Sequence, residues 1–228
     1  MEAQSTLEKP PRERAPVAVE HCPTCGAALP AGFRFCGQCG RALGAVLAPR
    51  PSDVVTIVFI DLKGFSKFTS RADVDAVREL VRVFQWLVRE QLAKHRGFEV
   101  KQLGDGFMIA FSDPKRAVGF AVDVQRSLSS HPVASPVALC AGINSGDAIR
   151  EGDDFFGHTV NVASRIATRA TGGQVLVSES TRTLAGELAG VEFVDAGRRQ
   201  LRGIPGRHRL YEAVWEGVAG FPARSLQN

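Results

Sequence analysis

The sequence predicts an α+β domain in which helices alternate with strands and hairpins interrupt the alternation. Three observations support this fold class. Residues 54–61, VVTIVFID, form an apolar, β-branched run that is typical of a buried strand. Residues 73–95 carry apolar side chains at helical spacing, which indicates a long amphipathic helix. Residues 98–112 contain two strand-like runs joined at a Gly-Asp-Gly sequence, which favours a hairpin.

The later elements continue the alternation. Asp113-Pro114 is typical of a helix start and opens a second helix over 114–130. Residues 136–150 predict a strand, a turn at Ser145-Gly146 and a returning strand. Further elements are expected as a helix after Gly157, a strand at 174–178, a short helix from Ser178, and strands at 191–197 and 207–215. The domain at 53–216 is long enough to bury one core.

Length and charge narrow the possible classes of protein. The chain has 228 residues and a net charge of +4, which permits an anionic ligand without requiring nucleic acid. The apolar run at 54–60 is far too short to cross a membrane. Residues 1–20 are charged and Pro-rich and lack the apolar segment of a signal peptide. We therefore expect a cytoplasmic protein with a disordered tail at 1–20 and a second tail at 217–228.

Four of the five cysteines form two CxxCG repeats within residues 21–43. The spacing of Cys22, Cys25, Cys36 and Cys39 predicts a tetrahedral zinc site. So short a segment cannot fold on its own core, and bound zinc can supply about 10–16 kcal/mol to sites of this type. Four cysteine ligands leave no open position, so the zinc is expected to be structural. Two disulfides are the alternative interpretation.

Two shorter features complete the organisation of the chain. Residues 44–52 include Pro49 and Pro51 and are interpreted as a linker between the cysteine segment and the main domain. The fifth cysteine, Cys140, lies in an apolar, strand-like run. It is expected to behave as a small buried apolar side chain.

Two carboxylates are predicted at one end of the sheet. Asp61 ends the first strand, and Asp105 lies at the tip of the hairpin. If these strands are neighbours, both carboxylates emerge at the same edge and can hold a pair of Mg²⁺ or Mn²⁺ ions. Each residue also has a structural alternative, since Asp61 could cap the next helix and Asp105 could serve a type I′ Asp-Gly turn.

An amide and a guanidinium share one face of the helix after Gly157. Asn161 and Arg165 are four residues apart, while Val162 and Ile166 can pack inward on a neighbouring face. The guanidinium is planar and permanently charged, so it suits a phosphoryl group. A solvated helix face is the alternative interpretation.

Three motifs together resemble the catalytic domain of the class III nucleotide cyclases. They are FIDLKGFS, VKQLGDGFM and DDFFGHTVNVASRI, in this order, and the resemblance covers about residues 53–214. Residues 21–43 resemble a zinc ribbon. The resemblance implies a ferredoxin-like, palm-like α+β fold that works as a head-to-tail homodimer. It also implies conversion of ATP to 3′,5′-cyclic AMP and pyrophosphate in cyclic nucleotide signalling, with two Mg²⁺ or Mn²⁺ ions in each site.

The resemblance assigns roles to the residues that would meet the metals and the triphosphate. Asp61 and Asp105 match the two metal-binding aspartates, and the backbone carbonyl of Leu62 matches a further metal ligand. Arg202, in the sequence LRG, stands where the family commonly has a lysine that contacts the triphosphate. This match is the weakest, because the motif is short and arginine replaces lysine.

The resemblance also assigns the residues that would meet the nucleoside. Lys101 and Asp154 match the pair that selects the purine, and Asn161 and Arg165 match the pair that orients the ribose and stabilises the transition state. Lysine only donates hydrogen bonds and ionised aspartate only accepts them, which fits the N1 and 6-amino groups of adenine. Guanylyl cyclases typically carry Glu and Cys or Ser here, so ATP is favoured. An ion pair unrelated to ligand is the alternative for Lys101 and Asp154.

Other functions remain open from the sequence. The domain could be a guanylate cyclase, or a catalytically silent nucleotide-binding or scaffold protein with the same fold. A zinc-ribbon protein that binds nucleic acid is a third alternative, because residues 197–210 contain five arginines and no acidic residue. Such runs are most often solvated hairpins, so neither nucleic acid nor a membrane is expected as a partner. The sequence does not identify a regulatory input or a protein partner for the ribbon.

Overall fold

The structure is a computed structural model that describes residues 21–22, 25–29, 36, 38, 43, 49 and 54–215. The chain divides into two compact units, Met1–Ala45 and Val46–Asn228, and each is described by itself. The tails predicted at 1–20 and 217–228, and all of the predicted linker except Pro49, lie outside the described residues. Within the described part, no helix is long and apolar enough to cross a membrane.

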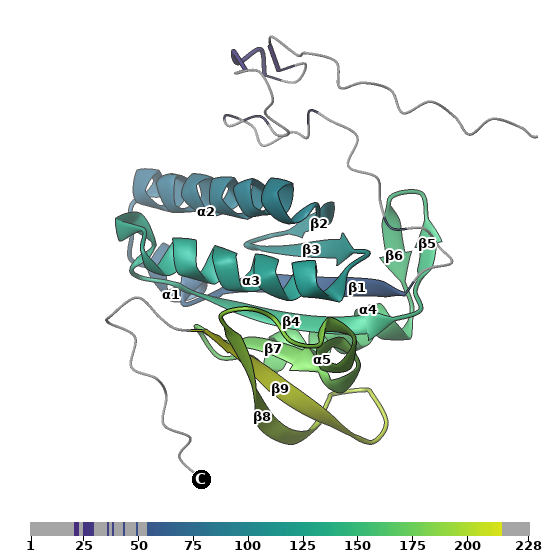
Figure 1. Cartoon of the computed structure of the whole chain (residues 1–228). Helices are drawn as coiled ribbons and strands as arrows, with labels where there is room; N and C mark the ends of the chain where they lie inside the picture. Colours follow the sequence, from purple (N-terminus) through teal and green to yellow (C-terminus); the bar gives the residue numbers. More distant parts are fainter. Residues whose placement is uncertain are drawn as a thin grey trace, which may run out of the picture. The chain divides into compact units, whose positions relative to one another are not determined.

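The larger unit is built on a seven-stranded sheet with the order β2-β3-β1-β4-β7-β9-β8 (Figure 1). The strands are β1 (Val55–Lys63), β2 (Phe98–Leu103), β3 (Gly106–Phe111), β4 (Ala138–Gly146), β7 (Val175–Ser178), β8 (Val191–Gln200) and β9 (Arg207–Trp215). Only the β4–β7 pair is parallel in this sheet. A separate two-stranded sheet pairs β5 (Ile149–Glu151) with β6 (Asp154–Phe156). The predicted α+β class is confirmed.

Helices cover both faces of the sheet. They are α1 (Phe65–Thr69), α2 (Val74–His95), α3 (Pro114–Ser129), α4 (His158–Arg169) and α5 (Glu179–Ala185), with a 3₁₀ turn η1 at Pro132–Ala134. The long helices α2 and α3 lie side by side over one face, and α4 lies behind the sheet in the same view (Figure 1). Helix α4 crosses β4 at Gly142, where an added Cβ would collide with the backbone of Ala167. The missing side chain therefore lets the helix approach the sheet closely.

The helix starts follow from local sequence. The carboxylate of Asp73 accepts a hydrogen bond from the Ala76 amide at 2.8 Å, and α2 begins at the next residue. Asp113 caps α3 in the same way, directly before Pro114. Ser178 caps α5, as its position before that helix predicts. These side chains satisfy amides that have no partner inside the helix.

The predicted turn at Ser145-Gly146 is wrong. Strand β4 continues through both residues, and β5 pairs with β6 instead of returning along β4. The Ser145 hydroxyl lies 2.9 Å from the Thr56 hydroxyl and 3.0 Å from the Thr181 hydroxyl, all of them buried. These contacts hold the serine in the strand. They join residues far apart in the sequence, so no local pattern could predict them.

The hairpin between β2 and β3 does not have the type I′ turn that was the structural alternative for Asp105. Leu103 pairs with Gly106, so Gly104 and Asp105 form a two-residue loop. Gly104 has a φ of 63°. Among the residues that the structure describes, Arg96 is the one non-glycine residue with positive φ, so the φ of Asp105 is negative. Glycine at the first loop position with negative φ at the second is the type II′ pattern.

Candidate functional site

Asp61 and Asp105 meet at one edge of the sheet. Ile60 pairs with Phe107 across the β1–β3 ladder, so Asp61 lies beside Gly106 and next to the hairpin tip that carries Asp105. An added Cβ at Gly106 would lie 2.5 Å from the Ile60 carbonyl oxygen and 3.4 Å from Oδ1 of Asp61. Both carboxylates are half-buried. Gly106 therefore allows the two acidic residues to approach each other closely, as predicted for neighbouring strands.

The two carboxylates repel each other. The pKa of Asp105 is raised, first by burial, then by the negative charge of Asp61 and a hydrogen bond between the two side chains. The positive charge of Lys63 partly opposes this shift. Carboxylate oxygens are the ligands that Mg²⁺ and Mn²⁺ prefer, so the donor set fits divalent cations. The side chain of Leu62 is buried at 3% exposure, so only its backbone carbonyl could join them.

Lys101 and Asp154 form a direct pair although 53 residues separate them. The Lys101 ammonium lies 2.6 Å from Oδ2 of Asp154, and its nitrogen lies 5.9 Å from the ring centroid of Phe156. The hydrogen bond from Lys101 is the main reason why the pKa of Asp154 is lowered. The pair links β2 to the short strand β6, which the sequence did not predict as a strand. Both side chains keep 41% and 32% of their surface exposed, so a ligand can reach them.

Asn161 and Arg165 lie on the exposed face of α4. Val162 and Ile166 anchor the helix on its other side and keep only 4% and 0% of their surface exposed. The helix begins after Gly157, which has a φ of 111° and caps the helix without a side chain. Among the described residues, none accepts a hydrogen bond from the Arg165 guanidinium. The face is therefore anchored as expected, and its charged group is available to a ligand.

Arg202 lies in the loop between β8 and β9. Its side chain is exposed, while Leu201 and Ile204 on either side are buried in the cluster that includes Ile166. The loop is thus anchored to the core at both ends. In the described part of the chain, Arg202 makes no hydrogen bond or ion pair with the other predicted site residues.

Sequence reasoning did not identify two residues near these groups. Lys63 follows Asp61 by two positions in β1 and therefore shares its face of the strand. Burial raises the pKa of the nearby Cys140 thiol to about 11, and the charge of Lys63 partly opposes this shift. Phe156, in β6, lies beside Lys101 of β2, and 42% of the surface of Phe156 is exposed. The alternation of the strand could have indicated Lys63, whereas the position of Phe156 depends on the pairing of β6.

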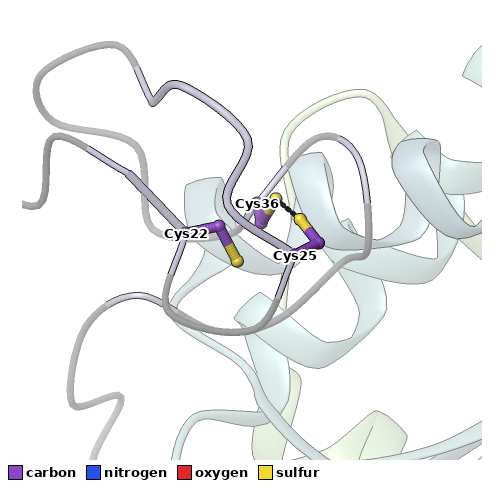
Figure 2. Close-up of side chains that lie close together, drawn as sticks. All are labelled: Cys22, Cys25 and Cys36. Carbon is purple, nitrogen blue, oxygen red and sulfur yellow. Dashed lines mark hydrogen bonds between the residues drawn. The ribbon is translucent and has the colours of Figure 1, made fainter.

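Three cysteine thiols converge in the smaller unit. Figure 2 shows Cys22, Cys25 and Cys36, whose sulfur atoms all lie within 4.8 Å of one another. The Gly26 amide donates to the Cys22 carbonyl at 2.9 Å and closes the turn of the first CxxCG repeat. The fourth predicted ligand, Cys39, lies outside the described residues. Three converging thiols are a donor set that suits zinc.

Comparison with family models finds two matches. Residues 47–214 match the adenylate and guanylate cyclase catalytic domain, and residues 21–43 match a zinc-ribbon domain. Both ranges agree with the resemblance that the motifs carry.

Several of the individual relatives are named as adenylate cyclases. The chain is 34% identical over 163 residues to a pH-sensitive adenylate cyclase of Mycobacterium tuberculosis, with 69% of this chain and 40% of that protein covered. It is 28% identical over 207 residues to a receptor-type adenylate cyclase of Trypanosoma congolense, with 71% and 28% covered. The chain therefore spans less than half the length of these curated relatives.

Solved structures share the fold. An adenylate/guanylate cyclase/hydrolase from Silicibacter pomeroyi superposes with a TM-score of 0.64 at 25% identity, covering 72% of this chain and 97% of that one. The adenylyl cyclase CyaB from P. aeruginosa gives 0.65 at 21% identity, covering 72% and 94%. The second likeness supports the architecture alone.

Proposed function

Because the chain belongs to the class III adenylate and guanylate cyclase family and carries a zinc ribbon, we propose that it is an adenylate cyclase. The substrate would be ATP, and the products 3′,5′-cyclic AMP and pyrophosphate. The observation that carries the choice of ATP is the Lys101–Asp154 pair, at 2.6 Å and open to a ligand. Its donor and acceptor match the N1 and 6-amino groups of adenine, whereas guanine reverses both.

Asp61, Asp105 and the carbonyl of Leu62 would hold two Mg²⁺ or Mn²⁺ ions. Bound there, the ions would lower the pKa of the ribose 3′-hydroxyl and offset charge on the triphosphate. The raised pKa of Asp105 supports this assignment, because two carboxylates this close favour a cation between them. Gly106 allows this close approach, because a Cβ there would meet the Ile60 carbonyl and Oδ1 of Asp61.

Asn161 and Arg165 would act on the reacting end of the nucleotide. The 3′-hydroxyl gives its proton to water and its oxygen bonds to the α-phosphorus. The bond from that phosphorus to the oxygen that bridges to the β-phosphorus breaks, and pyrophosphate leaves. Asn161 would orient the ribose for this attack. Arg165 would stabilise the charge that develops at the α-phosphate, a role worth about 3–4 kcal/mol by analogy with an oxyanion-hole donor. Arg202 would contact the triphosphate.

The active species would be a homodimer with two equivalent sites. Each functional residue occurs once in the domain, and the Asn161–Arg165 face of α4 is exposed. One protomer would supply Asp61 and Asp105, and its partner the purine pair and the α4 face. Separately, the zinc ribbon at residues 21–43 would hold one structural Zn²⁺ through its four cysteines, including Cys39.

The test is turnover by the purified chain. With Mn²⁺ or Mg²⁺ and either ATP or GTP, cyclic AMP should form faster than cyclic GMP. A matched variant, Lys101→Glu with Asp154→Ser, should move the preference toward GTP by about 10-fold or more, since its hydrogen-bonding groups differ. Predominant cyclic GMP from the unmodified protein would indicate a guanylate cyclase. ATP binding without cyclic product would indicate a silent nucleotide-binding protein.

A further inference from the structure

A cleft of about 430 Å³ lies where β4 and β7 end and α4 and α5 begin. None of the predicted site residues lines it. Its volume falls within the range of about 300–1,000 Å³ that is typical of small-molecule sites. The cleft therefore has room for a ligand and no role in the proposed reaction.

The floor of the cleft is polar and already ordered. Asn144, Ser145, Thr159 and Ser178 line it with only 5–7% of their surface exposed. The Asn144 amide donates to the Thr159 carbonyl at 3.1 Å, and the Ser180 hydroxyl donates to the Ser145 carbonyl at 2.9 Å. Other hydrogen bonds hold the hydroxyl groups of Ser145, Thr159 and Ser178. A ligand would therefore meet a preformed surface.

One wall is cationic and comes from the β8–β9 hairpin. Arg198 lies directly opposite Arg209 in the ladder, and Arg207 precedes Arg209 by two residues, so all three share one face. Arg207 donates to the Arg198 carbonyl at 3.2 Å. Among the described residues, none accepts a hydrogen bond from the Arg198 guanidinium. Glu179 is the one carboxylate residue among those that line the cleft, and Asp195, outside the lining, pairs with Arg209 at 2.6 Å. Arg198 and Arg207 form no ion pair among the described residues, so positive charge dominates.

Apolar side chains from the buried side of α4 also border the cleft. They are Val162 and Ile166, and only 4% and 0% of their surface is exposed. The cationic wall and the hydroxyl floor are therefore the surfaces that a ligand would meet, and they suit a molecule with a phosphate and some polar edges. Planar guanidinium groups bind phosphate oxygens in pairs, which is why arginine favours this class of ligand.

We propose that this cleft binds a small organic phosphate of about the size of a nucleoside monophosphate. Three of the five arginines that suggested nucleic acid in the sequence converge on this one cleft, namely Arg198, Arg207 and Arg209, so a single small molecule fits better than a polymer. The site is separate from the residues proposed for catalysis and does not depend on turnover.

The test is the binding of AMP to the full chain, measured by calorimetry without added divalent metal. AMP should bind, and Arg198→Ala with Arg207→Ala should weaken it at least 10-fold. The matched control is Arg199→Ala, which removes the same charge from the same strand but does not line the cleft. This control and Arg165→Ala should bind AMP as the unmodified protein does.

Several results would overturn the proposal. These are no AMP binding by the unmodified protein, equal binding by the double variant, or loss of binding in Arg165→Ala, which would place AMP at the catalytic site. Adenosine should bind at least 10-fold more weakly than AMP, and equal affinity would contradict phosphate recognition. If the double variant unfolds at a lower temperature than the unmodified protein, Arg198→Glu supplies a second measurement, and its AMP binding should also weaken at least 10-fold. Oligonucleotide binding that falls steeply with salt, without AMP binding, would favour nucleic acid instead.

Discussion

The carboxylate edge, formed by Asp61 and Asp105, and the exposed face of α4 carry opposite charges, and Lys63 offsets only part of the negative charge. At the edge, burial and the charge of Asp61 raise the pKa of Asp105, so the chain holds two acids together at a cost. On α4, the Arg165 guanidinium is exposed, and none of the described residues accepts a hydrogen bond from it. The first region needs a cation and the second an anion. A nucleotide triphosphate with its metal ions supplies both, which is the physical basis of the proposed shared site.

The largest effect should come from removing a carboxylate at the edge. Asp61→Ala should lower the rate of cyclic AMP formation by about 1,000-fold or more, because the ions that offset several kcal/mol of transition-state charge lose a ligand. Initial rates with Mn²⁺ measure this. The control is Asp75→Ala, an exposed acid on α2 that pairs with Arg78. Near-normal rates in a folded Asp61→Ala protein would remove the metal role.

Removing the cation on α4 should have the next largest effect. Arg165→Ala should lower kcat by about 100- to 1,000-fold, the usual loss for one group that stabilises transition-state charge. The KM for ATP should change less than kcat. Arg82→Ala, an exposed arginine on α2 paired with Glu79, should leave the rate unchanged. An equal loss in both variants would point to net charge and not to position.

The geometry of the edge can be disturbed without removing an acid. Gly106→Ala would place a methyl group 2.5 Å from the Ile60 carbonyl, so the tip must shift away from Asp61. We expect a loss of about 1–3 kcal/mol in unfolding free energy, measured with urea, together with reduced activity. Gly104→Ala is the control, since nothing lies within 4 Å of its Cβ and only its positive φ is strained. Full activity in Gly106→Ala would show that close approach is not required.

A charge cluster away from both regions should affect stability alone. Burial would raise the pKa of Asp123, but hydrogen bonds from Lys94 and His95 outweigh it and lower the pKa. A lowered pKa means that this carboxylate stabilises the fold above the ordinary aspartate value, and the contribution disappears as pH falls through the lowered pKa. Asp123→Asn should cost no more than about 1 kcal/mol at pH 7. Thermal melting against pH measures the loss, and unchanged cyclase rates are expected.

Much of the fold was predictable because its signals are local. The apolar run of β1, the caps Asp73 and Asp113, and the glycine-rich hairpin each depend on residues close in sequence. The continuation of β4 through Ser145 was not predictable, because hydroxyl contacts with Thr56 and Thr181 decide it. The short strand β6 was missed for the same reason, since its pairing with β5 defines it.

The site residues were identified through motifs, and their geometry came from topology. The sequence suggested that Asp61 and Asp105 meet if their strands are neighbours, and the β1–β3 ladder brings them together. The 2.6 Å contact between Lys101 and Asp154 spans 53 residues and could be expected only from the family resemblance. The Arg198 cleft has no local signal, because it combines two helix starts with a distant hairpin.

In the proposed homodimer, one site uses the carboxylate edge of one protomer and the α4 face of its partner. This arrangement is tested most directly by mixing Asp61→Ala with Arg165→Ala, each inactive alone. Random exchange makes half of the dimers mixed, each with one intact site, so about a quarter of normal activity should return. A mixture that stays inactive while sizing and labelled subunits show mixed dimers would contradict the shared site.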